Sequence, residues 1–411
     1  LLAGLGGAGL AWFLHEVVHL IYGTRSETLP AIEANTTARQ RFLVITAAGV
    51  VMALLWWAIR KWGPHPPNPE QAAAGASMSP GWTIAEALIE VANVGAGASI
   101  GRESAPREVG AMAADRLSAW TRLHPDERSV LIACAAGAGL AATYNVPVAG
   151  AVFGIETVLG ISWLRKTPLG HLAVVIPVAL GISYGAVFAG RLVVPHRHLY
   201  TVDYPNTGSF LSLLVLAAIL GLVLGPLGYA LGRLFTMVTK RGPKANRLLL
   251  VMPVGYLAVA ALAAWQPAIM GNGKLLAQGA FDRQLGTASL ILLIMLKPIA
   301  TALTMGSGAR GGRITPSFST GAAAGTLTAT YWARFFPLSI NGATLVGAAV
   351  MLATCTGSPL AAISLSIEMT GAPWRMILPV GLAVLIAWGT AQLLDRFERA
   401  RNASPETPTF D

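Results

Sequence analysis

Apolar segments separated by short polar segments follow one another along the whole chain. They lie near 1–22, 43–59, 82–100, 129–160, 168–190, 209–238, 248–270, 287–304, 343–368 and 376–394. A helix needs about 20 apolar residues to cross a bilayer, and several segments are too short, or too rich in glycine and proline, to form one clean span. Broken helices occur at membrane depth where they are buried in protein or line a cavity. The pattern therefore predicts an all-α polytopic membrane protein of tilted and broken helices, with its site at the breaks.

Composition excludes a pair of soluble domains, which the length of 411 residues would otherwise allow. Apolar residues make up 54% of the chain and charged residues 12%, about half the charged fraction of soluble domains. So few charges cannot cover a surface in water. Both cysteines, Cys134 and Cys355, lie in apolar segments, so we expect buried thiols rather than disulfides.

The net charge of +10 is distributed in short clusters between the apolar segments. The clustered residues are Arg60 and Lys61; Arg122 and Arg128; Arg165 and Lys166; Lys240, Arg241, Lys244 and Arg247; and Arg396, Arg399 and Arg401. This distribution differs from the single basic stripe of a nucleic-acid-binding protein, so we expect no nucleic acid partner. It is typical of cytoplasmic loops, which places both termini in the cytoplasm and 23–41 and 191–203 outside.

An internal repeat relates the two parts of the chain. Gly95–Arg102 matches Gly306–Arg313 at an offset of 211, and Pro147 and Glu156 match Pro359 and Glu368 at 212. We therefore predict two homologous membrane halves and a short cytoplasmic tail. The expected boundaries are 1–195 and 211–395 for the halves, 196–210 for the link and 396–411 for the tail. The sequence leaves open whether the halves run parallel or inverted.

Each repeated unit places a glycine-rich run before a helical pattern. Glycines let backbone amides turn toward a ligand, and a helix N-terminus carries a partial positive charge. Together they form an anion site without a fixed cation. Two such runs, in corresponding places of two halves, would converge on one pathway. The alternative is close helix packing through small residues.

Four motifs identify a family resemblance. They are Gly101-Arg102-Glu103, GSGARGGRITP at 306–316, GLAATYNVPVAGAVFGIE at 139–156 and GSPLAAISLSIEMT at 357–370. In order and spacing they resemble the chloride channel (CLC) family of anion channels and anion/proton exchangers. The resemblance implies a homodimer of all-helical subunits with inverted halves, without a regulatory domain, in a bacterial inner membrane. It implies a transporter rather than an enzyme, and no cofactor.

The resemblance also implies roles for single residues. Glu103 would be the gating glutamate, which competes with the permeant anion and carries a proton. Gly101, Arg102 and Gly312 would belong to the anion site, and the amides of Arg313 and Ile314 would coordinate the anion. The expected anion is chloride, with fluoride, bromide or nitrate as alternatives. An ion pair between Glu103 and Arg102 is the alternative role, although adjacent residues of a helix do not face each other.

Several positions depart from the family pattern. The segment 65–70 places Pro66 at the position of an anion-binding serine, and proline brings neither a hydroxyl nor an amide proton. The anion-contacting tyrosine near the C-terminus has no match. Thr157 stands where exchangers usually carry a second, inner glutamate. The sequence therefore leaves channel and proton-coupled exchanger both open.

Arg313 is a further departure. An arginine at membrane depth costs at least ~2.5–3.5 kcal/mol, so it needs a partner. It could face the anion, pair with a carboxylate such as Glu103, or extend to water. A fluoride-exporting branch of the family carries a similar Gly-Gly-x-Val-Thr-Pro with an acid at x. The present Gly-Gly-Arg-Ile-Thr-Pro shares Thr-Pro and reverses the charge. Fluoride export therefore stays an alternative.

A different class of function competes through His15, Glu16 and His19, an H-E-x-x-H string inside an apolar segment. Two histidines four residues apart share a helix face and could bind zinc, with the glutamate as general base. An intramembrane zinc metalloprotease would also need a third ligand, for which Asp395 is the late candidate. A polar cluster at a helix end is the simpler interpretation, and we expect no metal.

Overall fold

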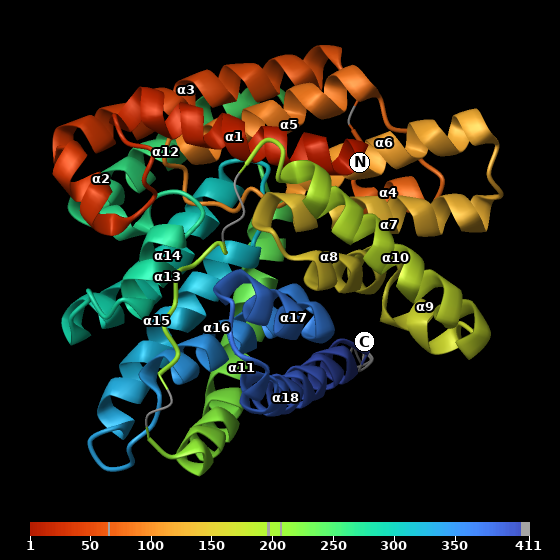
Figure 1. The fold of residues 1–411 in the computed structure, drawn as a ribbon. Helices are drawn as coiled ribbons and strands as arrows, with labels where there is room; N and C mark the ends of the chain where they lie inside the picture. Colours follow the sequence, from red (N-terminus) through yellow and green to blue (C-terminus); the bar gives the residue numbers. More distant parts are fainter. Residues whose placement is uncertain (65, 195–197, 206–207, 404–411) are drawn as a thin grey trace, which may run out of the picture.

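The computed structural model of the chain describes residues 1–64, 66–194, 198–205 and 208–403. This part of the chain contains eighteen α-helices and no sheet, apart from one isolated bridge between Gly101 and Gly312 (Figure 1). The helices are α1 (Leu2–Tyr22), α2 (Leu29–Asn35), α3 (Ala38–Trp62), α4 (Pro69–Ala73), α5 (Pro80–Gly95), α6 (Ser104–Thr121), α7 (Pro125–Tyr144), α8 (Pro147–Phe153), α9 (Ile161–Lys166), α10 (Leu169–Gly190), α11 (Phe210–Lys240), α12 (Leu248–Trp265), α13 (Lys274–Phe281), α14 (Thr287–Gly306), α15 (Ile314–Trp332), α16 (Ile340–Thr356), α17 (Pro359–Thr370) and α18 (Ile377–Ala403). The expected all-α fold is confirmed.

Seven of the described helices are long and apolar enough to cross a membrane. The spans are Leu2–Tyr22, Ala38–Trp62, Leu169–Gly190, Phe210–Lys240, Leu248–Trp265, Thr287–Gly306 and Trp374–Ala400. Only 33–44% of each apolar window is buried inside the protein. Large apolar side chains such as Val223 and Leu250 face outward, 62% and 71% exposed. Lipid is the solvent that suits such faces.

The two glycine-rich runs break the chain between helices as the repeat predicts. α5 ends at Gly95 before α6 begins, and α14 ends at Gly306 before α15 begins. Gly97 and Gly308, which correspond in the repeat, both have φ of +99°. This left-handed conformation favours glycine, because a Cβ atom would strain it. The repeat is thus present in the backbone as well as in the sequence.

Corresponding glutamates of the two halves exchange contacts. The Glu156 carboxylate accepts hydrogen bonds from the amides of Leu360 (3.1 Å) and Ala361 (2.6 Å), in the first turn of α17. The Glu368 carboxylate accepts hydrogen bonds from Val148 (3.2 Å) and Ala149 (2.6 Å), in the first turn of α8. Such an exchange is the signature of a two-fold relation, in which i contacts j and j contacts i. The helices α8 and α17 are therefore related to each other by an approximate two-fold.

The proposed boundaries of these halves stay a prediction. Residues 196, 197, 206 and 207 of the link and 404–411 of the tail lie outside the described residues, as does residue 65. Helices distant in the sequence nevertheless lie side by side, since α12 packs along α3 (Figure 1).

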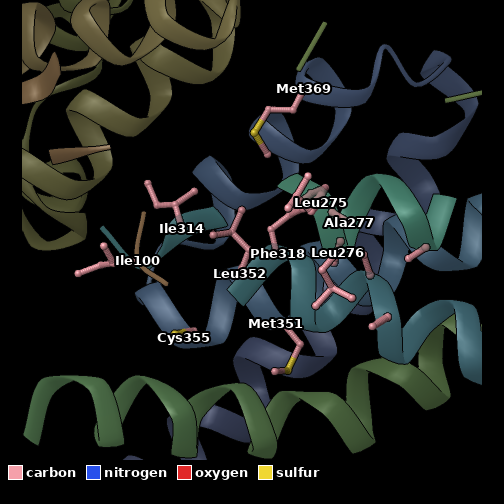
Figure 2. Packing of buried hydrophobic residues seen from close by; sticks show 14 of the residues in the cluster. Ile100, Leu275, Leu276, Ala277, Ile314, Phe318, Met351, Leu352, Cys355 and Met369 are labelled. Atoms are coloured by element: carbon pink, nitrogen blue, oxygen red, sulfur yellow. The ribbon is translucent and has the colours of Figure 1, made fainter. Parts of the chain in front are cut away.

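Small residues allow the central helices α15 and α16 to approach closely. A Cβ atom added to Gly321 would collide with the carbonyl oxygen of Gly347. Phe318 and Leu352 fill the adjoining layer, where Figure 2 shows them beside Ile314. Cys355 is buried in α16 and Cys134 in α7, both as free thiols, as predicted.

Candidate anion site

The two glycine-rich runs meet at one point. The amide of Gly101 donates to the carbonyl of Gly312, and the amide of Gly312 donates to the carbonyl of Gly101, each at 2.8 Å. This pairing brings together the segments that lead into α6 and α15. The N-terminus of each helix has amide groups without intrahelical partners, and its partial positive charge favours an anion.

The carboxylate of Glu103 occupies the start of α15. Its side chain is 1% exposed, and Oε1 accepts hydrogen bonds from the amide of Thr315 at 2.9 Å and from the Thr315 hydroxyl. Oε2 has no hydrogen-bond partner among the described residues. A Cβ atom at either Gly101 or Gly312 would collide with Oε2. Both glycines are therefore required to admit the carboxylate.

Arg102 lies beside this site without pairing with Glu103 in the described part of the chain. Its side chain is 3% exposed, and its guanidinium carbon lies 5.5 Å from the ring centre of Tyr144. This is the distance of a cation–π interaction. Nε and Nη1 have no hydrogen-bond partner among the described side chains and backbone groups. Arg102 thus adds positive charge to the region, while the Glu103 carboxylate is hydrogen-bonded to the start of α15.

A cavity of about 630 Å³ reaches Glu103. Its wall includes Gly312, Arg313 and Ile314 from the start of α15, and Lys240 from the end of α11. Glu70, Arg107, Glu156 and Thr157 complete its polar lining, together with several serine and threonine side chains. The cavity therefore extends between Glu103 and one of the basic clusters.

Arg313 lies in the wall of this cavity. Its Nη1 donates hydrogen bonds to the Thr236 hydroxyl at 2.9 Å and to the Gly232 carbonyl at 3.3 Å, both on α11. It also lines a second cavity of about 240 Å³. Among the described residues Arg313 is bonded to these neutral groups and pairs with no carboxylate, so its side chain presents a cation to the cavity.

Pro66 has a different position from the other candidates. Pro66 is buried. Of the segment 65–70, the residues that line the described cavity wall are Asn68 and Glu70. Asn68 caps α4, with its side chain accepting from the amide of Gln71 at 2.8 Å. The short helix that follows turns Glu70 toward Arg107, 2.5 Å away. Pro66 does not line the described cavity, and its anion-binding role stays a prediction.

Sequence reasoning did not single out Thr315 or the buried acids of α5 and α6. Thr315 stands in the first turn of a helix after a glycine run, where a side-chain donor adds to the amides. Glu86 and Glu90 lie one helical turn apart in an apolar segment, where acids are rare and functional. Both signals were readable from the sequence.

The H-E-x-x-H string forms no metal site in the described structure. His15 Nδ1 lies 2.6 Å from the Ala11 carbonyl, and Glu16 pairs with Arg25 at 3.3 Å. Asp395 pairs with Arg399 at 2.7 Å. No group of three His, Cys, Asp or Glu residues in the described ranges could hold a metal ion. The protease alternative has no support.

Comparison with known proteins agrees with this arrangement. The sequence model of the family described as "Voltage gated chloride channel" matches residues 48–392. A ClcB-like chloride channel protein of Ralstonia nicotianae is 32% identical over 367 residues, which cover 85% of this chain and 82% of that protein. The voltage-gated ClC-type chloride channel ClcB of Escherichia coli O17:K52:H18 is 28% identical over 410 residues, 96% of this chain and 94% of the relative.

Solved structures share the fold. A slow cyanobacterial Cl⁻/H⁺ antiporter superposes with a TM-score of 0.81 at 21% identity, covering 98% of this chain and 96% of its own. A CLC-type fluoride/proton antiporter superposes with a TM-score of 0.72 at 20% identity. The match covers 95% of this chain and 93% of the antiporter chain. From the family match and the relatives, the chain belongs to the voltage-gated chloride channel (CLC) family of integral membrane anion transport proteins.

Proposed function

We propose that this chain is a homodimeric chloride/proton exchanger of the bacterial inner membrane, with Glu103 as its gate and both termini in the cytoplasm. One observation carries the proposal. The Glu103 carboxylate occupies the N-terminus of α15, bonded to the amide and the hydroxyl of Thr315. This is a place where backbone amides and the helix dipole favour any small anion.

Competition between the carboxylate and a chloride ion follows from that position. An ionised Glu103 and an anion are attracted by the same potential, so one excludes the other. Protonation removes the negative charge of the side chain and frees the site. The chloride would then be held by the amides of Arg313 and Ile314 and by the positive charge of Arg313. Each cycle would couple one side-chain protonation to the passage of anions.

Fluoride export is the second candidate. The Thr315 hydroxyl at the gate supports it, as does the fold shared with the fluoride/proton antiporter. Two observations favour chloride. Arg313 brings a positive charge where the fluoride branch has an acid, and the curated relatives are described as chloride channels. Bromide and nitrate are expected to follow chloride through the same site, because they are monovalent anions closer to chloride in size and hydration than fluoride is.

Reconstitution in liposomes tests the proposal. Anion efflux and external pH are recorded together, with chloride, fluoride, bromide or nitrate as the internal anion. We expect chloride efflux accompanied by a stoichiometric movement of protons. Chloride efflux without proton movement would make the protein a channel. Efflux restricted to fluoride would make it a fluoride exporter.

A further inference from the structure

A carboxylate and a guanidinium are paired in the wall of the cavity that reaches Glu103. Glu70, on α4, and Arg107, on α6, both line this cavity, and Glu70 Oε1 lies 2.5 Å from Arg107 Nη2. This is the short contact of a charge-assisted hydrogen bond. The mechanism proposed above makes no use of this ion pair, although it lies in the same cavity as the gate.

Arg107 stands one helical turn after the gating residue. Glu103 is the N-cap residue of α6, and Arg107 follows it by four positions, so the two side chains share one face of the helix. Four residues correspond to a rise of about 6 Å. In the proposed pathway, an anion that moves between the start of α15 and the cavity therefore passes within reach of Arg107.

The guanidinium of Arg107 is held by a contact that does not depend on Glu70. Its carbon Cζ lies 4.7 Å from the ring centre of Phe153, within the range of a cation–π interaction. The side chain is 15% exposed, and its buried Nε has no hydrogen-bond partner among the described residues. Because a guanidinium has five N–H donors, Arg107 is a ligand that remains in place for an anion.

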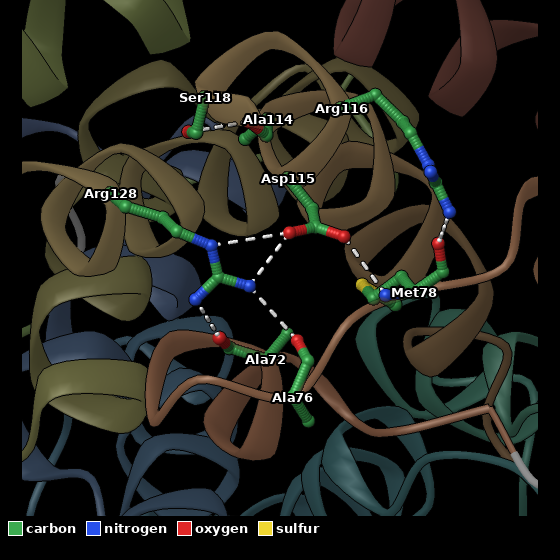
Figure 3. A network of polar contacts seen from close by, with 8 residues as sticks. All are labelled: Ala72, Ala76, Met78, Ala114, Asp115, Arg116, Ser118 and Arg128. Atoms are coloured by element: carbon green, nitrogen blue, oxygen red, sulfur yellow. Dashed lines mark hydrogen bonds and ion pairs between the residues drawn. The ribbon is translucent and has the colours of Figure 1, made fainter. Parts of the chain in front are cut away.

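The backbone that carries Glu70 is anchored at both ends of α4. A capping box formed by Asn68 fixes the start of the helix. Near its end, Arg128 donates to the carbonyl of Ala72 at 2.8 Å, and Asp115 holds Arg128 at 2.6 Å (Figure 3). The Glu70 side chain itself is 39% exposed. Glu70 therefore leaves Arg107 by rotation of its side chain into the cavity.

Arg107 and Arg313 differ in their access to an anion. The charged residues of the cavity wall are Glu70, Glu103, Arg107, Glu156, Lys240 and Arg313. Of the two arginines, Arg107 is paired with a carboxylate in the described part of the chain, and Arg313 is bonded to neutral groups. A partly exposed ion pair is weak, so an anion in the cavity can replace the carboxylate.

We propose that Glu70 and Arg107 form a second, inner gate, in which the Glu70 carboxylate competes with chloride for the Arg107 guanidinium. The inference rests on the chloride pathway proposed above. While Glu70 lies on Arg107, the carboxylate neutralises this cation and takes the place of an anion. Chloride that enters the cavity displaces the carboxylate, which turns into water. Chloride then lies one helical turn from the position that Glu103 occupies.

The test is a double-mutant cycle on chloride binding to the purified chain, measured by titration calorimetry. Glu70→Gln keeps the size of the side chain and removes the competing charge, so chloride should bind about fivefold more tightly, the upper range for a partly exposed ion pair. Arg107→Gln removes the ligand and should weaken binding at least about fivefold. Adding Glu70→Gln to Arg107→Gln should change the affinity less than about twofold, because the competition is gone.

Glu16→Gln is the matched control for loss of a negative charge. The Glu16 carboxylate also pairs with an arginine, Arg25 at 3.3 Å, and is similarly exposed at 34%. Glu16 lies outside the described cavity wall, so the variant should bind chloride with wild-type affinity. A gain in affinity equal to that of Glu70→Gln would be an effect of net charge and would overturn the inner gate.

An additive cycle also rejects the inner gate. If Glu70→Gln strengthens chloride binding equally with and without Arg107, Glu70 repels anions at a distance and does not occupy their site. Unchanged affinity in Glu70→Gln is equally decisive against it. In both cases chloride transport by the wild-type protein leaves the proposed function standing.

The cycle is repeated with fluoride to separate the two proposals. A wild-type protein that binds and moves fluoride and not chloride overturns the proposed chloride transport. The inner gate is then decided by the fluoride cycle, in which a gain for Glu70→Gln that depends on Arg107 upholds it and an additive result rejects it.

A second measurement covers an Arg107→Gln protein that fails to fold. It needs Glu70→Gln, which alters a partly exposed side chain, and wild type, both crystallised with bromide, whose anomalous scattering locates the ion. Bromide in contact with the Arg107 guanidinium, at higher occupancy in Glu70→Gln than in wild type, supports the inner gate. Glu70→Gln crystals with bromide elsewhere in the cavity and none at Arg107 contradict it.

Discussion

The carboxylate of Glu103 accepts a hydrogen bond from the amide of Thr315, 2.9 Å away and 212 residues along the chain. This contact joins the N-cap residue of α6 to the first turn of α15, and the two helix starts correspond in the repeat. It places an ionisable group where the two helix ends would otherwise attract a free anion. In the proposed mechanism the gate is thus part of the anion site rather than a separate element above it.

The positive charge of Arg313 should strengthen anion binding. Removing it in Arg313→Ala leaves the backbone amides of α15 and is expected to weaken chloride binding about tenfold, equal to about 1.4 kcal/mol. Titration calorimetry of the purified protein with chloride measures the change. Arg165→Ala, which removes an exposed arginine of α9, is the control for net charge. Unchanged affinity and anion selectivity in folded Arg313→Ala would place the side chain outside the pathway.

The exchanged caps of α8 and α17 should contribute similar stability. Glu156→Gln and Glu368→Gln each remove a negative charge bonded to two amides at a helix start. Each is expected to lower the unfolding free energy by about 1–2 kcal/mol. Thermal unfolding of both variants in one detergent gives the comparison. A large effect of one glutamate beside no effect of the other would contradict their equivalence.

Glu27, in the loop between α1 and α2, should make stability depend on acid pH. Burial raises the pKa of Glu27, but the positive charges of Lys274, Arg102 and His15 together outweigh it and lower the pKa to about 2. Lys274 Nζ lies 2.9 Å from the carboxylate. A carboxyl with a lowered pKa stabilises the fold above its unfolded pKa of ~4.3, and that stability is lost as pH falls toward 2.

The measurement is the unfolding midpoint of wild type and of Glu27→Gln. It is recorded from about pH 6, above the unfolded-state pKa, down to about pH 2, the folded-state pKa of Glu27. The wild-type advantage at pH 6 should be of the order of 3 kcal/mol and should shrink steadily below pH ~4.3. Glu33→Gln, an exposed acid of α2, supplies the control. A difference between wild type and Glu27→Gln that stays constant over this range would refute the ion-pair explanation.

Much of the fold was readable from the sequence because its signals are local. Glycine runs broke the helices at 95–103 and 306–313, and the nearly constant offset of 211 to 212 indicated that these breaks correspond. The reciprocal contacts of Glu156 and Glu368 were not readable, since they depend on the packing of α8 against α17. The partner of Arg313 was unreadable for the same reason, because Thr236 reaches it only through the docking of α11.

The acids of α5 and α6 show the same limit in the candidate site. Their presence in apolar segments was visible, yet their convergence depends on Arg310, more than 200 residues away from Glu108. Pro66 depends on packing in the same way. Counting along the motif placed it at the anion, and its role there stays a prediction, while the turn into α4 brings Asn68 and Glu70 to the cavity wall.

Glu103 itself gives the most discriminating variants. Glu103→Gln keeps the size of the side chain and removes its charge, so it imitates the protonated gate permanently. We expect it to abolish proton movement and to make chloride flux independent of external pH. Glu103→Ala also removes the side chain that occupies the start of α15, so chloride should pass faster and passively. Both are measured by parallel chloride and pH recording in liposomes.

The control for these variants is Glu16→Gln, which neutralises an acid of the H-E-x-x-H string that pairs with Arg25 at 3.3 Å. It should retain wild-type transport, because Glu16 lies outside the described cavity wall. The decisive comparison is proton pumping driven by a chloride gradient. If folded Glu103→Gln still moves protons against chloride, the carboxylate bonded to Thr315 is a structural cap of α15, and the gate must be sought at another ionisable group of the cavity.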